Sequence, residues 1–104
     1  MYLIRKRVDY MDLSNSRVLV LGLGITGLST VKALHKLDAQ IIVSDSKKEE
    51  DLREFFQKID DIYVEKYLVT EDIPLEDIDL IIKSPGIPPS NPIIHEAKKR
   101  NIEV

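Results

Sequence analysis

Residues 17–29 read R-V-L-V-L-G-L-G-I-T-G-L-S, and this stretch decides the fold. Its first five residues are a nearly continuous apolar run that stops at Gly22, which is typical of a strand buried on both faces of a sheet. Beyond this run, apolar residues recur at helical spacing, at Ile25, Leu28, Val31, Leu34 and Leu37. A buried strand, a short glycine loop and an amphipathic helix in this order indicate a parallel α/β sheet.

The alternation of strands and helices continues along the chain. We expect further strands over 40–44, 62–67, 79–83 and from 102, and further helices over 46–59 and 91–100. Ser46 is expected to cap the first of these helices, and Asn91, followed by Pro92, to cap the second. The predicted fold is α/β, a Rossmann-like open parallel sheet of about five strands in the order 3-2-1-4-5, with helices on both faces.

Length and composition exclude several classes of protein. The chain has 104 residues, 43% hydrophobic and 32% charged, which fits one globular domain. A net charge of −3 is too balanced for a typical nucleic-acid binder, so no nucleic-acid partner is expected. The lack of cysteine excludes disulfides, cysteine-ligated metals and a thiol nucleophile. No apolar run reaches the roughly 20 residues that span a bilayer, so we expect a cytoplasmic protein without a membrane partner.

The two ends of the sequence suggest how the domain is bounded. We expect residues 1–11 to form a loosely held N-terminal extension, since Met11 precedes the first strand closely and is itself a possible start of translation. Residues 12–104 are then the folded domain. Residues 102–104 begin a strand at which the sequence stops, so we expect a fragment of a longer multidomain protein.

Gly22, Gly24 and Gly27 form the pattern G-x-G-x-x-G between the first strand and the first helix. There, the first glycine permits a tight turn, the second lets a ligand approach the backbone, and the third lets the helix pack closely. Free N–H groups at the helix start favour an anion, usually a phosphate. The alternative is a tight connection without a ligand. Leu28 stands where a P-loop requires lysine, so no machinery for nucleoside triphosphate hydrolysis is expected.

Asp45 ends the second strand and lies 23 residues after Gly22. A carboxylate at that place accepts hydrogen bonds from ribose hydroxyls, and the alternative is an aspartate that only caps a helix or a turn. Lys47 follows at the same edge and is expected either in solvent or against a phosphate or base. The hydroxyl of Thr26 either faces a ligand or caps the first helix.

A second group of turn-forming residues, S-P-G-I-P-P over 84–89, follows the strand at 79–83. In the predicted order this strand neighbours the first, and ligands bind where the connections reverse direction between two such strands. We call the glycine loop over 22–27 the first window and the segment over 84–89 the second window. We therefore expect the two windows to face each other across one crevice. Pro85 and Gly86 fit a type II turn with positive φ at the glycine, and the Gly86 N–H and the Ser84 hydroxyl are expected to face the ligand. The alternative is a rigid loop without a ligand.

Together these motifs resemble the N-terminal domain of the Mur ligases of peptidoglycan synthesis, in particular the branch that adds D-glutamate to UDP-N-acetylmuramoyl-L-alanine. The resemblance rests on residues 18–29, Asp45 and K-S-P-G-I-P over 83–88, and covers about residues 12–104. It implies a domain that binds the UDP part of that substrate. The implied binding residues are Gly24, Ile25, Thr26, Gly27, Asp45, Ser46, Lys47, Ser84, Pro85, Gly86 and Ile87. Of these, the glycine loop would hold the diphosphate, residues 45–47 would border the uracil and ribose, and residues 84–87 would close the other side.

The same resemblance implies an ATP-dependent ligase of cell wall biogenesis. Its central ATPase domain, with ATP and Mg²⁺, and its C-terminal domain would lie outside this chain, which would bind but not catalyse. No cofactor, metal ligand or catalytic residue is expected here, and His35 and His95 are expected in solvated or packing roles. Two alternatives stay open. One is a module for NAD or an adenine nucleotide, as in dehydrogenases or regulatory domains, and the other is an interaction domain that kept the fold and lost the ligand.

Overall fold

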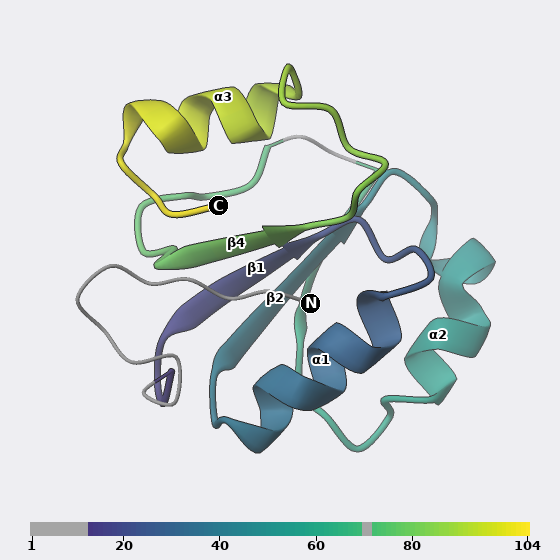
Figure 1. Cartoon of the computed structure of the whole chain (residues 1–104). Helices are drawn as coiled ribbons and strands as arrows, with labels where there is room; N and C mark the ends of the chain where they lie inside the picture. The colour runs from purple at the N-terminus through teal and green to yellow at the C-terminus, as the bar shows by residue number, and fades with distance from the viewer. Residues whose placement is uncertain (1–12, 70–71) are drawn as a thin grey trace.

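The computed structural model describes residues 13–69 and 72–104, which form a layer of parallel strands between helices (Figure 1). The elements in chain order are β1 (Arg17–Leu21), α1 (Gly27–Lys36), β2 (Gln40–Asp45), the 3₁₀ helix η1 (Glu49–Leu52), α2 (Arg53–Gln57), β3 (Glu65–Leu68), β4 (Leu80–Lys83) and α3 (Pro92–Lys99). The expected extension over 1–11 lies outside the described residues. Within the described ranges, no helix has the length and apolar character needed to cross a membrane.

Within the described residues, the sheet has four parallel strands, which follow the predicted order as β3-β2-β1-β4. In the centre, Val20 of β1 lies beside Val43 of β2 and Ile82 of β4. At the position of the predicted fifth strand, a single parallel bridge joins Leu80 to Glu103. The sheet therefore follows the predicted order 3-2-1-4-5, with one residue pair in place of the fifth strand.

Both faces of the sheet are buried. Successive side chains of a strand point to opposite faces, so Val18 and Val20 join the core beneath α1 and α2, whereas Leu19 and Leu21 pack with α3. Figure 1 shows α1 and α2 on one face of the sheet and α3 on the other. Burying one such aliphatic side chain contributes roughly 1.5–3 kcal/mol, which explains why a strand without a polar face lies between two helical layers.

Between β2 and β3, local structure differs from the sequence prediction. The helix expected over 46–59 is a 3₁₀ turn followed by the short helix α2. The prediction that Ser46 caps this helix is wrong, because Lys48 takes the N-cap position of η1, without a side-chain hydrogen bond. The strand expected from residue 62 begins at Glu65, since the N–H of Ile62 donates to the carbonyl of Ile59 at 2.9 Å and closes a turn.

Candidate functional site

The two windows that contain the glycines meet at the carboxyl ends of β1 and β4. A Cβ atom at Gly22 would lie 2.8 Å from Cδ1 of Ile87 and 2.9 Å from Cβ of Ser84, closer than real Cβ contacts. The φ of Gly22 is 87°, a value that L side chains rarely adopt. At Gly24, a Cβ would lie 3.7 Å from Oγ of Ser84, which is an ordinary contact. The prediction that the windows face each other is confirmed, and Gly22 permits their close approach.

A cleft of about 620 Å³ opens between these windows and the end of β2, a volume usual for a small-molecule site. Its lining residues are Leu21, Gly22, Leu23, Gly24, Ser44, Asp45, Ser46, Lys47, Leu52, Val69, Ser84, Ile87, Asn91 and Ile93. The implied binding residues in this lining are Gly24, Asp45, Ser46, Lys47, Ser84 and Ile87. The implied binding residues outside it are Ile25, Thr26, Gly27, Pro85 and Gly86.

Asp45 holds the start of the glycine loop. Its Oδ2 accepts a hydrogen bond from the N–H of Leu23 at 2.8 Å, and its Oδ1 accepts one from the N–H of Lys47 at 2.9 Å. The second contact is an Asx turn, so the alternative of a turn aspartate is correct for part of its role. The first contact links the ends of β1 and β2. Each carboxylate oxygen keeps a further lone pair, so Asp45 can also accept a hydrogen bond from a ligand.

The tip of the glycine loop presents backbone N–H groups that have no acceptor among the described residues. The N–H of Gly22 donates to a carbonyl of β2 at 2.8 Å, and that of Gly27 donates to the carbonyl of Gly24 at 3.0 Å. Within residues 13–69 and 72–104, no acceptor is found for the N–H groups of Gly24, Ile25 and Thr26. All three residues are exposed and directly precede α1. Consecutive free N–H groups at a helix start bind anions, and phosphates in particular.

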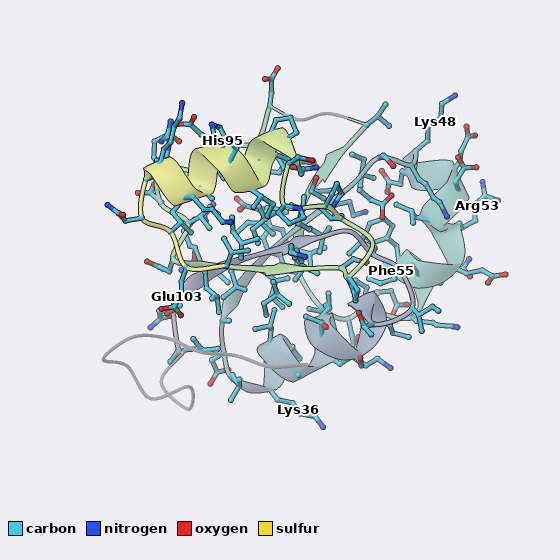
Figure 2. The ribbon with its side chains drawn as sticks, turned by 45° about the horizontal axis from the view of Figure 1, so that its top comes forward. Lys36, Lys48, Arg53, Phe55, His95 and Glu103 are labelled. Atoms are coloured by element: carbon cyan, nitrogen blue, oxygen red, sulfur yellow. The ribbon has the colours of Figure 1, made fainter. Side chains whose placement is uncertain are left out.

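Three of the implied residues lie beside the cleft. Ile25 is fully exposed. Thr26 takes the N-cap position of α1 without a side-chain hydrogen bond, so the capping alternative for its hydroxyl is wrong. Gly27 is buried, and a Cβ there would lie 3.3 Å from Cε2 of Phe55, a residue of α2 labelled in Figure 2, and 3.4 Å from Cβ of Leu23. Gly27 therefore allows α1 and α2 to pack closely.

The second window forms a turn that differs from the expected type. The N–H of Ile87 donates to the carbonyl of Ser84 at 3.0 Å and closes this turn. Gly86 lacks the positive φ of a type II turn, so that expectation is wrong. The N–H of Gly86 donates to Oγ of Ser84 at 3.3 Å, and this bond stabilises the backbone conformation that Gly86 adopts. The two groups that were expected to face the ligand are thus bonded to each other. Lys83 supports the turn, because its Nζ donates to the carbonyl of Ile87 at 3.1 Å.

The cleft also contains residues that the sequence does not indicate as site residues. Among them are Val69, directly after β3, and Asn91, which the sequence indicates only as a helix cap. The φ of Val69 is 62°, and its N–H donates to the carbonyl of Asp45 at 2.9 Å. Both residues lie at the carboxyl edge of the sheet, where ligands of open α/β folds bind. The predicted strand order is therefore the sequence signal that could have indicated Val69 and Asn91 as site residues.

The charged residues of the cleft lining are Asp45 and Lys47. Leu28, at the place of a P-loop lysine, packs against the core. Within the described parts of the chain, no three His, Cys, Asp or Glu side chains are placed to hold a metal ion. His95 on α3 (Figure 2) and His35 are exposed and do not line this cleft. The residues of this lining are suited to bind an anionic ligand.

Solved structures confirm the Rossmann-like fold. A dipicolinate synthase subunit from Bacillus halodurans is 20% identical, with a TM-score of 0.59 over 94% of this chain and 40% of that one. SirC, a precorrin-2 dehydrogenase, is 22% identical, with a TM-score of 0.51 over 84% of this chain and 40% of that one. At this level of identity the likeness concerns the fold alone.

Two relatives with higher sequence identity are ligases. UDP-N-acetylmuramoylalanine--D-glutamate ligase of Clostridioides difficile (strain 630) is 43% identical over 91 residues, and that of Alkaliphilus metalliredigens (strain QYMF) is 40% identical over 97 residues. The matches cover 85% and 90% of this chain but only 20% and 21% of those proteins, so the chain spans about a fifth of their length. The family model "Mur ligase MurD-like, N-terminal domain" matches residues 16–104. This chain therefore belongs to the family of MurD-like N-terminal domains of Mur ligases.

Proposed function

We propose that this chain is the UDP-precursor-binding domain of a ligase that adds D-glutamate to UDP-N-acetylmuramoyl-L-alanine in peptidoglycan synthesis. The observation that carries the proposal is the row of N–H groups at Gly24, Ile25 and Thr26, which have no acceptor in the described part of the chain and lie at the edge of a cleft between two loops. Such a row is suited to bind a diphosphate. Membership of the MurD-like family supports a UDP precursor as the molecule that carries this diphosphate.

In the proposed complex, the ligand lies across the carboxyl ends of β2, β1 and β4. The diphosphate lies over residues 24–26 at the start of α1. Residues 45–47 border the uracil and ribose, with Asp45 accepting hydrogen bonds and Lys47 supplying the positive charge of the cleft. Residues 84–87 close the side of β4. Apolar lining residues such as Leu52 suit the face of a base or sugar.

The number of phosphate-binding loops favours UDP over a dinucleotide. A dinucleotide normally uses two mononucleotide-binding halves of a doubly wound sheet. This chain has one G-x-G-x-x-G loop, and its described residues form four strands in the order β3-β2-β1-β4, which is about one such half. One phosphate-binding loop beside one nucleoside wall is what a UDP-sugar requires.

The ligation itself requires parts beyond these residues, since the chain spans about a fifth of its ligase relatives. In the proposed longer protein, a central ATPase domain with ATP and Mg²⁺ activates the substrate carboxylate as an acyl phosphate, which the nitrogen of D-glutamate then attacks. A C-terminal domain completes this cytoplasmic enzyme. The contribution of the present chain is to bind and orient the UDP end, so the chain alone is expected to bind without catalysing.

Calorimetric titration of the chain with UDP and with NAD tests the proposal. We expect saturable binding of UDP at or below millimolar concentrations, and weaker binding of NAD. Tighter binding of NAD than of UDP would favour the dinucleotide alternative. No binding of either nucleotide would favour an interaction domain without a ligand.

A further inference from the structure

We propose that the side-chain amide of Asn91 is a further ligand-binding group of the cleft, which donates a hydrogen bond from Nδ2 to the diphosphate. The inference rests on the proposed function and adds a residue outside both the glycine loop and the S-P-G turn. It is carried by three features of Asn91: the bond that its Oδ1 makes, the rigidity of its backbone, and its place in the cleft lining.

The contact that Asn91 makes with α3 fixes the orientation of its amide group. Its Oδ1 accepts a hydrogen bond from the N–H of Ile93 at 2.8 Å. A backbone N–H needs an acceptor, so this bond determines which amide atom is the oxygen. Nδ2 must then point away from the helix, and in the described part of the chain it has no hydrogen-bond partner. The half-buried side chain thus retains its donors for another group.

The backbone of Asn91 holds this amide in place. Its N–H donates to the carbonyl of Pro88 at 3.0 Å, and its own carbonyl accepts from the N–H of His95 at 2.9 Å. Pro92 follows at the first position of α3 and restricts φ there. A donor held in this way loses little conformational entropy when a ligand binds, which favours its use in recognition.

The place of Asn91 in the cleft indicates which part of the ligand it meets. In the sheet order, β1 and its phosphate-binding loop lie between β2, which carries the proposed nucleoside wall, and β4. Asn91 lines the cleft together with Ser84 and Ile87, which follow β4. No charged side chain is found in this part of the lining, among the residues that the structure describes. Nδ2 of Asn91 and the hydroxyl of Ser84 are its side-chain donors, and phosphate oxygens are the acceptors nearest to the glycine loop.

Two substitutions separate ligand binding from helix capping. Asn91→Asp keeps an oxygen acceptor for the N–H of Ile93 but replaces the donor with a second, negatively charged oxygen. Asn91→Ser also preserves a good N-cap, and it removes the amide. We expect urea unfolding midpoints close to wild type for both variants. We expect UDP to bind roughly tenfold or more weakly to Asn91→Asp, and several-fold more weakly to Asn91→Ser.

A charge-matched control distinguishes a direct contact from general repulsion. Lys98→Gln lowers the net charge by the same amount on the same helix, at an exposed position outside the cleft, and is expected to bind UDP like wild type. Uridine, which lacks phosphate, is expected to bind to wild type and to both Asn91 variants equally. The inference would be overturned if the Asn91 variants lost as much affinity for uridine as for UDP. It would also be overturned if Lys98→Gln lost as much affinity for UDP as the Asn91 variants.

The result also separates this inference from the proposed function. If wild type binds UDP and both Asn91 variants bind it equally well, Asn91 is not a ligand-binding residue and the proposed function stands. If wild type itself does not bind UDP, the proposed function fails, and the role of Asn91 in binding a diphosphate fails with it.

Discussion

Asp45 and Leu23 join the ends of β2 and β1 through a hydrogen bond of 2.8 Å, from the N–H of Leu23 to Oδ2 of Asp45. Leu23 is buried, so its N–H has little access to water as an alternative partner. The bond holds the first turn of the glycine loop, in which the N–H groups of Gly24, Ile25 and Thr26 have no acceptor among the described residues. The same aspartate that the sequence predicts to contact a ribose thus also shapes the glycine loop.

Asp45→Ala is therefore expected to destabilise the domain even without a ligand. It removes the acceptor of two backbone N–H groups, one of them on buried Leu23, which predicts a loss of about 1–3 kcal/mol in the free energy of unfolding. Urea denaturation measures this loss. Asp60→Ala, at an exposed acid, is the control and should unfold like wild type. A wild-type midpoint for Asp45→Ala would show that the bond to Leu23 does not stabilise the loop.

The first two glycines of the loop are expected to respond differently to alanine. Gly22→Ala places a Cβ 2.8 Å from Cδ1 of Ile87 at a φ of 87°, and should reduce the free energy of unfolding by about 1–3 kcal/mol. In Gly24→Ala the new Cβ would contact only Oγ of Ser84, at 3.7 Å, so the free energy of unfolding should change by less than about 0.5 kcal/mol. Thermal or urea unfolding of the pair checks this contrast, which equal effects would contradict.

Gly24→Val is expected to weaken UDP binding without unfolding the domain. The branched side chain would project from the exposed tip of the loop and cover its free N–H groups, whereas the space at Gly24 accommodates a Cβ. Calorimetric titration with UDP, together with an unfolding curve for each protein, measures both properties. Unchanged affinity would place the ligand away from this loop.

The pH dependence of α3 is expected to involve Glu96. Nε of Arg100 donates to Oε2 of Glu96 at 3.0 Å, and this hydrogen bond lowers the pKa of Glu96, with smaller effects from the charges of Arg100, Lys99 and His95. Because the pKa of Glu96 is depressed in the folded chain, the Glu96–Arg100 pair stabilises the fold at pH values above the unfolded-state pKa. This contribution is lost as the pH falls through the folded-state pKa.

Arg100→Gln should therefore raise the pKa of Glu96 toward its ordinary value and remove this part of the acid dependence. Titration of the Glu96 carboxyl carbon by NMR, in wild type and in the variant, measures the shift directly. The same pKa in both proteins would show that the hydrogen bond to Arg100 is not formed in solution.

The sequence predicts the sheet well because its signals are strong and local. Val18 to Leu21 are all apolar, so they require a cover on both faces, and the alternation of strands and helices then determines the strand order. Asn91 followed by Pro92 predicts the start of α3 correctly, since the N-cap bond is made within three residues.

The features that the sequence does not predict depend on contacts between distant segments. The bond from Leu23 to Asp45 follows from the register of β1 and β2, which places Leu21 beside Ser44. The turn at Gly86 is set by Oγ of Ser84, and not by the proline and glycine that favour type II. The role of Gly27 depends on Phe55, which the chain brings against α1 from another helix.

The most direct test is an NMR titration of the isotope-labelled chain with UDP, in which every backbone amide is observed. We expect saturable changes at Gly24, Ile25 and Thr26, at residues 45–47, and at Ser84, Gly86 and Ile87, with no change at Glu96, which lies outside the cleft lining. An absence of change at the glycine loop at millimolar UDP, or changes confined to residues outside the cleft, would contradict the proposal that this domain binds a UDP precursor there.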